Sequence, residues 1–260
     1  MKVQFRGKKR EIPEYLEELT ADQYVRWLSL AALYQGGAIS IDLLRVAWLS
    51  HLLGLKTDYT AYQPAIAAEA ARLMSCTDGF YDTEVRDGVA VLSPRLLTGK
   101  QMLPDFMGWK GPGDMLDGMT FGAFTDSLTL LDEARRTTDT EALGTIYEQI
   151  ARQMYHADTA DAPATPPRLL VIHAVNMLAE VWRQIVNEPV EVNGAQIDFG
   201  ILFRKGGRSH ADDKTGWSGI AMEVAQQGVF GPMTGVAAAP MWDVLLYLYK
   251  CKYETLNHKH

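Results

Sequence analysis

One segment of the chain concentrates residue types that could do chemistry. It runs from Phe203 to Gly219 and reads FRKGGRSHADDKTGWSG, so basic side chains, a histidine and adjacent aspartates lie among glycines. Glycines near a lysine and a threonine are typical of a phosphate loop. However, the G-x-x-x-x-G-K-[ST] pattern is absent, because Lys214 follows Asp213. The two aspartates would also repel a phosphate, so the segment is not expected to bind nucleotides.

The same segment contains the residue types of a catalytic triad in Ser209, His210 and Asp212. A triad needs side chains that converge from separate elements, together with a preformed oxyanion hole. These three residues are near neighbours in the chain, and the segment lacks the G-x-S-x-G nucleophile motif. We therefore expect no catalytic residues of this kind.

A metal ion is the alternative chemistry for this segment. His210, Asp212 and Asp213 carry the nitrogen and oxygen donors that divalent ions take. A stable site usually needs three or four donors placed together, which a short His/Asp motif in a loop does not ensure. The competing hypothesis is a polar connection before a helix from Trp217, with Asp213 or Thr215 helping to cap that helix.

The basic side chains of the segment favour a protein partner. They are Arg204, Lys205, Arg208 and Lys214. Loops on a rigid scaffold often carry binding residues, and a basic cluster would steer an acidic partner in a salt-dependent way. We predict these four as partner-binding residues, and with them Trp109 of the glycine-rich GWKGPGD stretch (108–114).

The remaining histidines form no recognisable metal or catalytic array. His51 and His173 lie in apolar helical stretches, where a lone histidine is more often a core residue than a ligand. His258 and His260 lie at the end of the chain. No H-x-x-x-H or H-E-x-x-H pattern occurs among them, and we predict no cofactor.

Composition limits the class of protein. The 260 residues are 47% hydrophobic and 22% charged, which is ordinary for a soluble globular chain. A formal charge of −7 disfavours nucleic-acid binding, which needs a basic face. The longest apolar run, 169–182, is shorter than the ~20 residues of a membrane span. The chain has two cysteines, too few for a disulfide framework, and no secretory signal pattern. We therefore expect a cytoplasmic protein without a membrane partner.

Hydrophobic spacing predicts a mainly α fold with short β-hairpins, an α+β class with a helical core and small antiparallel β elements. Thr20 and Gln23 form a capping-box pattern before one helix. Gly7, Asp87-Gly88 and Asn193-Gly194 mark the turns of three hairpins. The predicted helices cover residues 21–35, 41–53, 61–76, 120–137, 139–155, 168–186, 217–227 and 240–253.

The stretch HADTADAPATPP, residues 156–167, is the predicted linker, because it is rich in alanine, proline, threonine and aspartate. It would separate a helical N-terminal half with two hairpins, residues 1–155, from a helical C-terminal half with one hairpin, residues 168–260. The two halves could also pack as a single domain.

Three stretches resemble a known group of proteins. They are IPEYLEELTADQYVRWLSLAALYQGG (12–37), GPGDMLDGMTFGAFTDSLTLLDEARRTTDTEAL (111–143) and GWSGIAMEVAQQGVFGPM (216–233). They are similar to uncharacterised bacterial proteins encoded among prophage or phage-tail genes and, more loosely, to helical tail-assembly chaperones. In these proteins a helix start like 120–124 precedes a helical pair, and a turn like 228–231 precedes a C-terminal helix. The resemblance implies a role in phage-tail assembly and no catalytic residues.

The leading hypothesis is a cytoplasmic, non-enzymatic assembly or accessory protein that binds a protein partner, such as a phage-tail component, and that could remain in the assembled particle. Binding would use helix-in-groove packing or pairing at a hairpin edge. The alternative is a metal-dependent enzyme of unknown reaction that uses the 203–219 loop. A nucleic-acid accessory protein is the third hypothesis, which the negative charge disfavours. The sequence predicts no oligomeric state.

Overall fold

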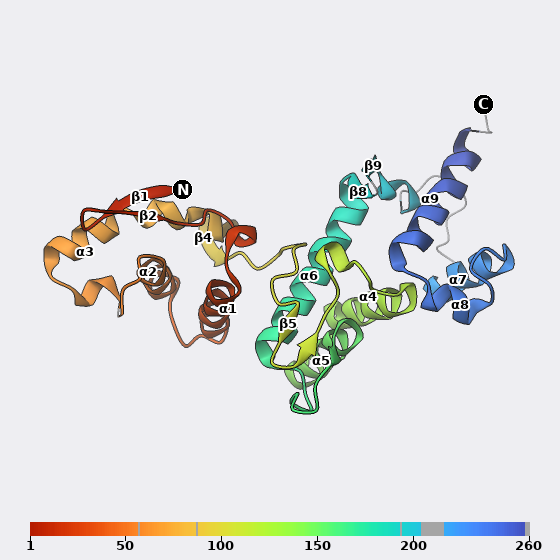
Figure 1. Cartoon of the computed structure of the whole chain (residues 1–260), viewed down its shortest axis with the longest axis horizontal. Coiled ribbons are helices and arrows are strands. Elements are labelled where there is room, and N and C mark those ends of the chain that lie inside the picture. The colour runs from red at the N-terminus through yellow and green to blue at the C-terminus, as the bar shows by residue number, and fades with distance from the viewer. Residues whose placement is uncertain (57, 87, 193, 204–215, 258–260) are drawn as a thin grey trace. The chain divides into compact units, whose positions relative to one another are not determined.

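The computed structural model describes residues 1–56, 58–86, 88–192, 194–203 and 216–257. The chain divides into two compact units, Met1–Leu96 and Leu97–His260 (Figure 1). The structure is 58% helical with antiparallel sheets of two or three strands, which confirms the predicted mainly helical α+β class.

The first unit contains two hairpins and three α-helices. Its elements are β1 (Lys2–Phe5), β2 (Lys8–Glu11), η1 (Leu16–Glu18), α1 (Ala21–Gln35), α2 (Ile41–Leu52), η2 (Tyr59–Ala61), α3 (Pro64–Ala71), η3 (Met74–Phe80), β3 (Tyr81–Arg86) and β4 (Val89–Pro94). β1 pairs with β2 and β3 with β4, both antiparallel. The predicted helix 61–76 is shorter in the structure, where α3 ends at Ala71. Only Ala70 of α3 is buried, so few side chains anchor this helix to the unit.

The capping box predicted for α1 is confirmed. The Thr20 hydroxyl accepts a hydrogen bond from the Gln23 backbone N–H at 3.3 Å, and the Gln23 side-chain oxygen accepts one from the Thr20 N–H at 3.0 Å. Two backbone donors at the helix start are thereby satisfied. Gly36 is the C-cap of the same helix.

An aromatic core holds the first unit together. The Trp27 ring lies 5.1 Å from Trp48, 5.5 Å from Phe80 and 5.5 Å from Tyr81, measured between ring centroids. All four side chains are buried. The Trp27 Nε1–H also donates to the Arg95 carbonyl oxygen at 2.9 Å. This contact fixes α1 to the chain just beyond β4.

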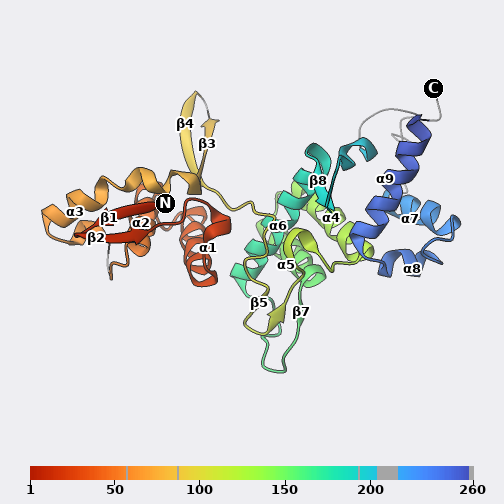
Figure 2. The same ribbon diagram turned by 45° about the horizontal axis from the view of Figure 1, so that its top comes forward.

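The β3–β4 hairpin projects from the helices of the first unit (Figure 2). Its strands pair from Tyr81 opposite Pro94 to Arg86 opposite Val89. Near the tip, Val85 is 75% exposed and Val89 62% exposed. Gly88 has a positive φ of 76°, as the predicted turn requires; Asp87 lies outside the described residues.

The second unit is mainly helical. Its elements are β5 (Asp105–Phe106), β6 (Trp109–Lys110), η4 (Asp114–Leu116), α4 (Phe121–Arg136), α5 (Thr140–Met154), β7 (His156–Ala157), α6 (Arg168–Asn187), β8 (Val190–Val192), β9 (Ala195–Ile197), η5 (Phe199–Leu202), α7 (Gly216–Gln226), α8 (Met233–Ala238) and α9 (Met241–Asn257). β6 lies between β5 and β7 in a three-stranded sheet, and β8 pairs with β9. Figure 1 shows α6 beside α4 and α5, against which it packs.

α6 forms the centre of this unit. Its buried side chains include Leu170, Met177, Val181 and Ile185. Within the described residues it is also the one helix whose length and apolar composition would suffice to cross a membrane. Its buried side chains and its packing against α4 and α5 are those of a core helix, as the sequence predicts for the run 169–182.

The division at Leu96 differs from the boundary predicted at residues 156–167. That segment lies inside the second unit and is tied to it by backbone contacts. β7 pairs with β6, and the Asp158 N–H donates to the Gly108 carbonyl at 2.9 Å. The Arg152 side chain also donates to the Ala164 carbonyl at 2.8 Å. A composition rich in alanine and proline does not reveal such pairing.

We expect the first unit to fold alone, because its aromatic core lies entirely between Met1 and Leu96. A fragment of residues 1–96 should show a helical circular dichroism spectrum and one cooperative thermal transition. The fragment 97–260 is the matched comparison. A fragment 1–96 without a cooperative transition would contradict independence of the two units.

Candidate functional site

The central part of the chemically rich segment, residues 204–215, lies outside the described residues. This holds for the predicted partner-binding residues Arg204, Lys205, Arg208 and Lys214 and for the candidate metal ligands His210, Asp212 and Asp213. Both hypotheses therefore stay predictions. The residues that flank the segment, Phe203 and Gly216, are described, and both line the same groove.

This groove lies among α7, α9 and the end of η5, and we call it the α7–α9 groove. Its volume is about 550 Å³. The lining is mostly apolar or aromatic, with a glutamate, a lysine, a cysteine and a threonine among it. The lining residues are Leu202, Phe203, Gly216, Trp217, Ile220, Glu223, Leu245, Leu248, Cys251, Lys252 and Thr255.

Four aromatic rings fix one wall of the groove to the core helices. We call Phe124, Trp182, Phe203 and Trp217 the Trp217 cluster. The Trp217 ring centroid lies 6.1 Å from Trp182 and 6.3 Å from Phe203, and Trp182 lies 4.9 Å from Phe203. Phe124 of α4 lies 6.4 Å from Trp217. Edge-to-face pairs at these distances are favourable, so the start of α7 and the end of η5 are held against α4 and α6.

α9 supplies the opposite wall and is anchored only through its first half. The Met241 N–H donates to the Met119 carbonyl at 3.0 Å, and the Trp242 Nε1–H donates to the Met115 carbonyl at 3.2 Å. Val244 and Leu245 are fully buried. No residue from 250 to 257, a range that the structure describes completely, is buried. Figures 1 and 2 show this part of α9 extending away from α8.

Large apolar side chains are exposed in the last part of the second unit. Among the described residues, five such side chains lie between α7 and the end of α9. They are Met222, Val229, Met233, Tyr253 and Leu256. Two of them, Tyr253 and Leu256, lie on the last turns of α9, beyond its buried first half.

Trp109, the remaining predicted partner-binding residue, is 3% exposed. The Arg152 guanidinium carbon lies 5.6 Å from the centre of its ring, within range of a cation–π contact. The Trp109 backbone also belongs to the central strand of the β5–β6–β7 sheet. Its side chain therefore packs the second unit and offers no free aromatic surface.

A buried amide organises the irregular stretch before α4. The Gln101 Oε1 accepts hydrogen bonds from the Leu103 N–H at 2.9 Å, the Tyr155 hydroxyl at 3.0 Å and the His173 Nε2–H at 2.7 Å. Its Nε2 donates to the Pro112 carbonyl at 3.0 Å. One side chain thus joins the stretch 101–112 to α5 and α6.

His173 is a core residue, as expected from its apolar surroundings. Its side chain is fully buried, and burial lowers its pKa from 6.5 to about 3. The imidazole is therefore neutral near pH 7, with its Nε2–H pointing to Gln101. Burial also raises the pKa of the Tyr155 hydroxyl. Both groups are held in one protonation state around neutral pH, which suits a structural role.

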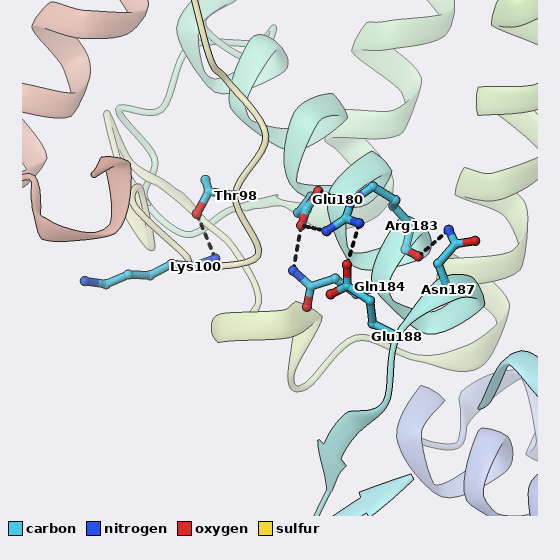
Figure 3. A network of polar contacts seen from close by, with 7 residues as sticks. All are labelled: Thr98, Lys100, Glu180, Arg183, Gln184, Asn187 and Glu188. Carbon is cyan, nitrogen blue, oxygen red and sulfur yellow. Dashed lines mark hydrogen bonds and ion pairs between the residues drawn. The ribbon is translucent and has the colours of Figure 1, made fainter. Parts of the chain in front are cut away.

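A second polar network lies on the last turns of α6 (Figure 3). Glu180 is 8% exposed and accepts bonds from Arg183 Nε at 2.9 Å and Nη2 at 2.8 Å. It also accepts a bond from Gln184 Nε2 at 2.7 Å. The Arg183 Nη1 reaches Glu188 at 2.6 Å, and these hydrogen bonds raise the pKa of Arg183. The Glu180 carboxylate is paired in this way and joins neighbouring turns at the end of α6.

Across the residues that the structure describes, no group of three or more His, Cys, Asp or Glu side chains could hold a metal ion. The α7–α9 groove is the candidate site that the described residues offer here, and its mostly apolar lining suits an apolar segment. Sequence reasoning missed it, although Trp217, Ile220 and Val224 follow helical spacing. Comparison with protein-family models, curated proteins and solved structures found no match to this chain.

We expect burial of neutral His173 to make stability depend on acidity. Its pKa is about 3 in the folded chain and about 6.5 in the unfolded chain. Between these values the unfolded chain binds one more proton, so stability falls as pH falls, by up to about 1.4 kcal/mol per pH unit. Chemical denaturation of the native chain and of His173→Gln from pH 7 to pH 4 measures this slope. Equal slopes in the two proteins would contradict the assignment.

Proposed function

We propose that this chain is a non-enzymatic assembly or accessory protein that binds a helical segment of a protein partner in the α7–α9 groove. The observation that carries the proposal is the groove itself. It combines an apolar lining, a wall fixed by the Trp217 cluster and a second wall that projects beyond the rest of the unit. Amphipathic helices bind proteins by laying an apolar face into a groove of this kind.

The chemistry of the lining supports a protein segment as the occupant. Trp217, Phe203 and Leu248 present aromatic and aliphatic surface, which favours an apolar helical face. Glu223 on α7 and Lys252 on α9 place opposite charges on the two walls. Charged groups at the edge of an apolar groove set orientation and specificity more than affinity. A helix with one apolar face and charged flanks fits this lining.

We further propose assembly of a phage-tail-like particle in the cytoplasm as the setting. The support is the resemblance of residues 12–37, 111–143 and 216–233 to proteins encoded among phage-tail genes. The third of these stretches contains α7, so it includes one wall of the groove. A tail component is the proposed partner, and the protein could remain in the particle after assembly.

We also propose that Arg204, Lys205, Arg208 and Lys214 steer an acidic partner. These residues lie in the chain between Phe203 and Gly216, which both line the groove. Exposed charges act at long range and are screened by salt, with a Debye length near 10 Å at about 0.1 M. Steering would thus act on the encounter, while the groove would determine the lifetime of the complex.

The groove is tested by two substitutions on one helix. Ile220→Lys places a charge in the lining, whereas Met222→Lys changes an exposed residue of α7 outside the lining. Tagged chains are recovered from the native host at low salt, and co-purifying proteins are quantified by mass spectrometry. We expect Ile220→Lys to lower partner recovery at least about tenfold, with Met222→Lys unchanged.

Thermal unfolding of both variants checks that each remains folded. Equal partner recovery with the two folded variants would overturn the proposal for the groove. Recovery of the native chain without any tail component, while the tail genes are expressed, would remove the proposed setting but leave the groove to be tested with other partners.

The basic segment is tested by reversing its four charges together, with Glu at positions 204, 205, 208 and 214. We expect lower partner recovery at low salt and a weaker dependence of recovery on salt, because the long-range attraction is removed. A matched control reverses Lys8, Lys9, Arg135 and Arg136, which are basic residues outside the groove lining. Unchanged recovery and salt dependence would rule out steering by the segment.

A further inference from the structure

We propose that the segment bound in the α7–α9 groove is the second half of α9 from another copy of this chain. The two copies would form a reciprocal two-fold dimer in which each α9 covers the groove of its partner. This inference rests on the proposed function of the groove and names the occupant. It is carried by two apolar surfaces of the same unit that the described residues leave uncovered and that fit each other in chemistry and length.

The first surface is the groove, and the second is a stripe along α9. Apolar residues recur along this helix at spacings of four and three, as in the contact seam of a coiled coil. They are Trp242, Leu246, Tyr249, Tyr253 and Leu256. We call the last three the α9 stripe.

The stripe is covered at its beginning and open at its end. The Phe199 ring of η5 lies 5.7 Å from Trp242 and 5.9 Å from Tyr249. Beyond that contact, Tyr253 is 53% exposed and Leu256 is 42% exposed. Tyr253 stacks on Tyr249 of the same helix at 5.9 Å between ring centroids. The first half of the stripe thus packs on η5, whereas Tyr253 and Leu256 stay largely exposed. A partner helix or groove would cover them.

The two surfaces match in length. From Tyr249 to Leu256 the helix rises about 10 Å, and from Trp217 to Glu223 the α7 wall rises about 9 Å, at 1.5 Å per residue. An aromatic and aliphatic stripe would meet the indole and aliphatic lining of the groove. The resulting contact would bring α7 and α9 of two copies together as four helices in two layers.

A two-fold dimer would cover more exposed apolar surface than a different helix bound in the groove. In a two-fold interface each contact between residue i and residue j occurs twice. One association would therefore cover both grooves and both stripes. A different helical protein would cover the groove but leave Tyr253 and Leu256 exposed.

The charges beside these surfaces are also complementary between copies. Glu223 lies on the α7 wall, and Lys252 lies on α9 one turn from Tyr249 and Leu256. Within the part of the chain that the structure describes, neither side chain forms an ion pair. Lys252 also lines the groove of its own copy. In the reciprocal dimer Lys252 of each copy would flank the groove that carries Glu223 of the other, so two opposite-charge contacts form between copies. Flanking charges of this kind select partners in helical assemblies.

Charge reversal with mixing tests the dimer directly. Sedimentation equilibrium of the full chain should give a dimer. Glu223→Lys alone and Lys252→Glu alone should each weaken the dimer at least about tenfold, because like charges then face each other. An equimolar mixture of the two variants should restore dimers, since both contacts are again between opposite charges. The double variant Glu223→Lys/Lys252→Glu should dimerise like the native chain.

A substitution in the α9 stripe provides an independent measurement. Tyr253→Lys changes an exposed residue and should shift the chain to monomer without lowering its melting temperature. Val229→Lys, at another exposed apolar residue outside the stripe and the groove lining, should leave the dimer intact.

A monomeric native chain, or a dimer unaffected by Tyr253→Lys and by both charge reversals, would overturn the proposed occupant. If the mixture of charge variants stays monomeric, the charges do not pair between copies, and the proposed geometry is wrong. The function of the groove is judged separately. If the native chain is a monomer and Ile220→Lys still lowers partner recovery, the groove binds another protein, and only the inference about the second copy fails.

Discussion

The contact between Trp217 and the rings of Trp182, Phe203 and Phe124 is the constraint on which the groove depends. α7 follows a segment outside the described residues, and Val224 is its one buried side chain. Packing of Trp217 against rings from α4, α6 and the end of η5 therefore positions the helix. Since the same ring lines the groove, the interaction that places α7 also supplies part of the proposed binding surface.

α9 is packed against the unit through its first half, whereas its second half is exposed. Backbone and indole hydrogen bonds near Met241 and Trp242, with the buried Val244 and Leu245, anchor the first half. The second half continues as a regular helix although none of its residues is buried. Isolated short helices are marginal in water, so this half gains from any partner that covers Tyr253 and Leu256. The groove and the exposed end of α9 are the two surfaces on which the proposed association depends.

Much of the fold follows from local sequence signals. The Thr20–Gln23 capping box, the glycine turns and the apolar spacing of α4, α5 and α6 predict elements that the structure contains. The prediction of a linker at 156–167 missed the pairing of β7 with β6, because a strand of two residues has no sequence pattern of its own. α8 was missed for a similar reason: it has six residues, and Gly235 lies within it.

The candidate site was less predictable than the fold. The types of residue present directed the prediction to 203–219 and to Trp109. Trp109 is buried beside the β5–β6–β7 sheet, and residues 204–215 are not among the described residues. A groove arises from residues of η5, α7 and α9 that are far apart in sequence, such as Phe203 and Leu248. Helical spacing identifies which face of each helix is apolar. It does not reveal which apolar faces the tertiary packing leaves uncovered.

Site-specific photo-crosslinking tests the central claim most directly. A benzophenone side chain at position 220 reports what lies in the groove inside the native host, and the same group at position 222 reports the outer face of α7. A defined protein crosslinked from position 220 and absent from position 222 is the result that this account predicts, with the crosslinked peptide mapping to a helix. Equal crosslinking from both positions, or none from position 220, would contradict binding in the groove.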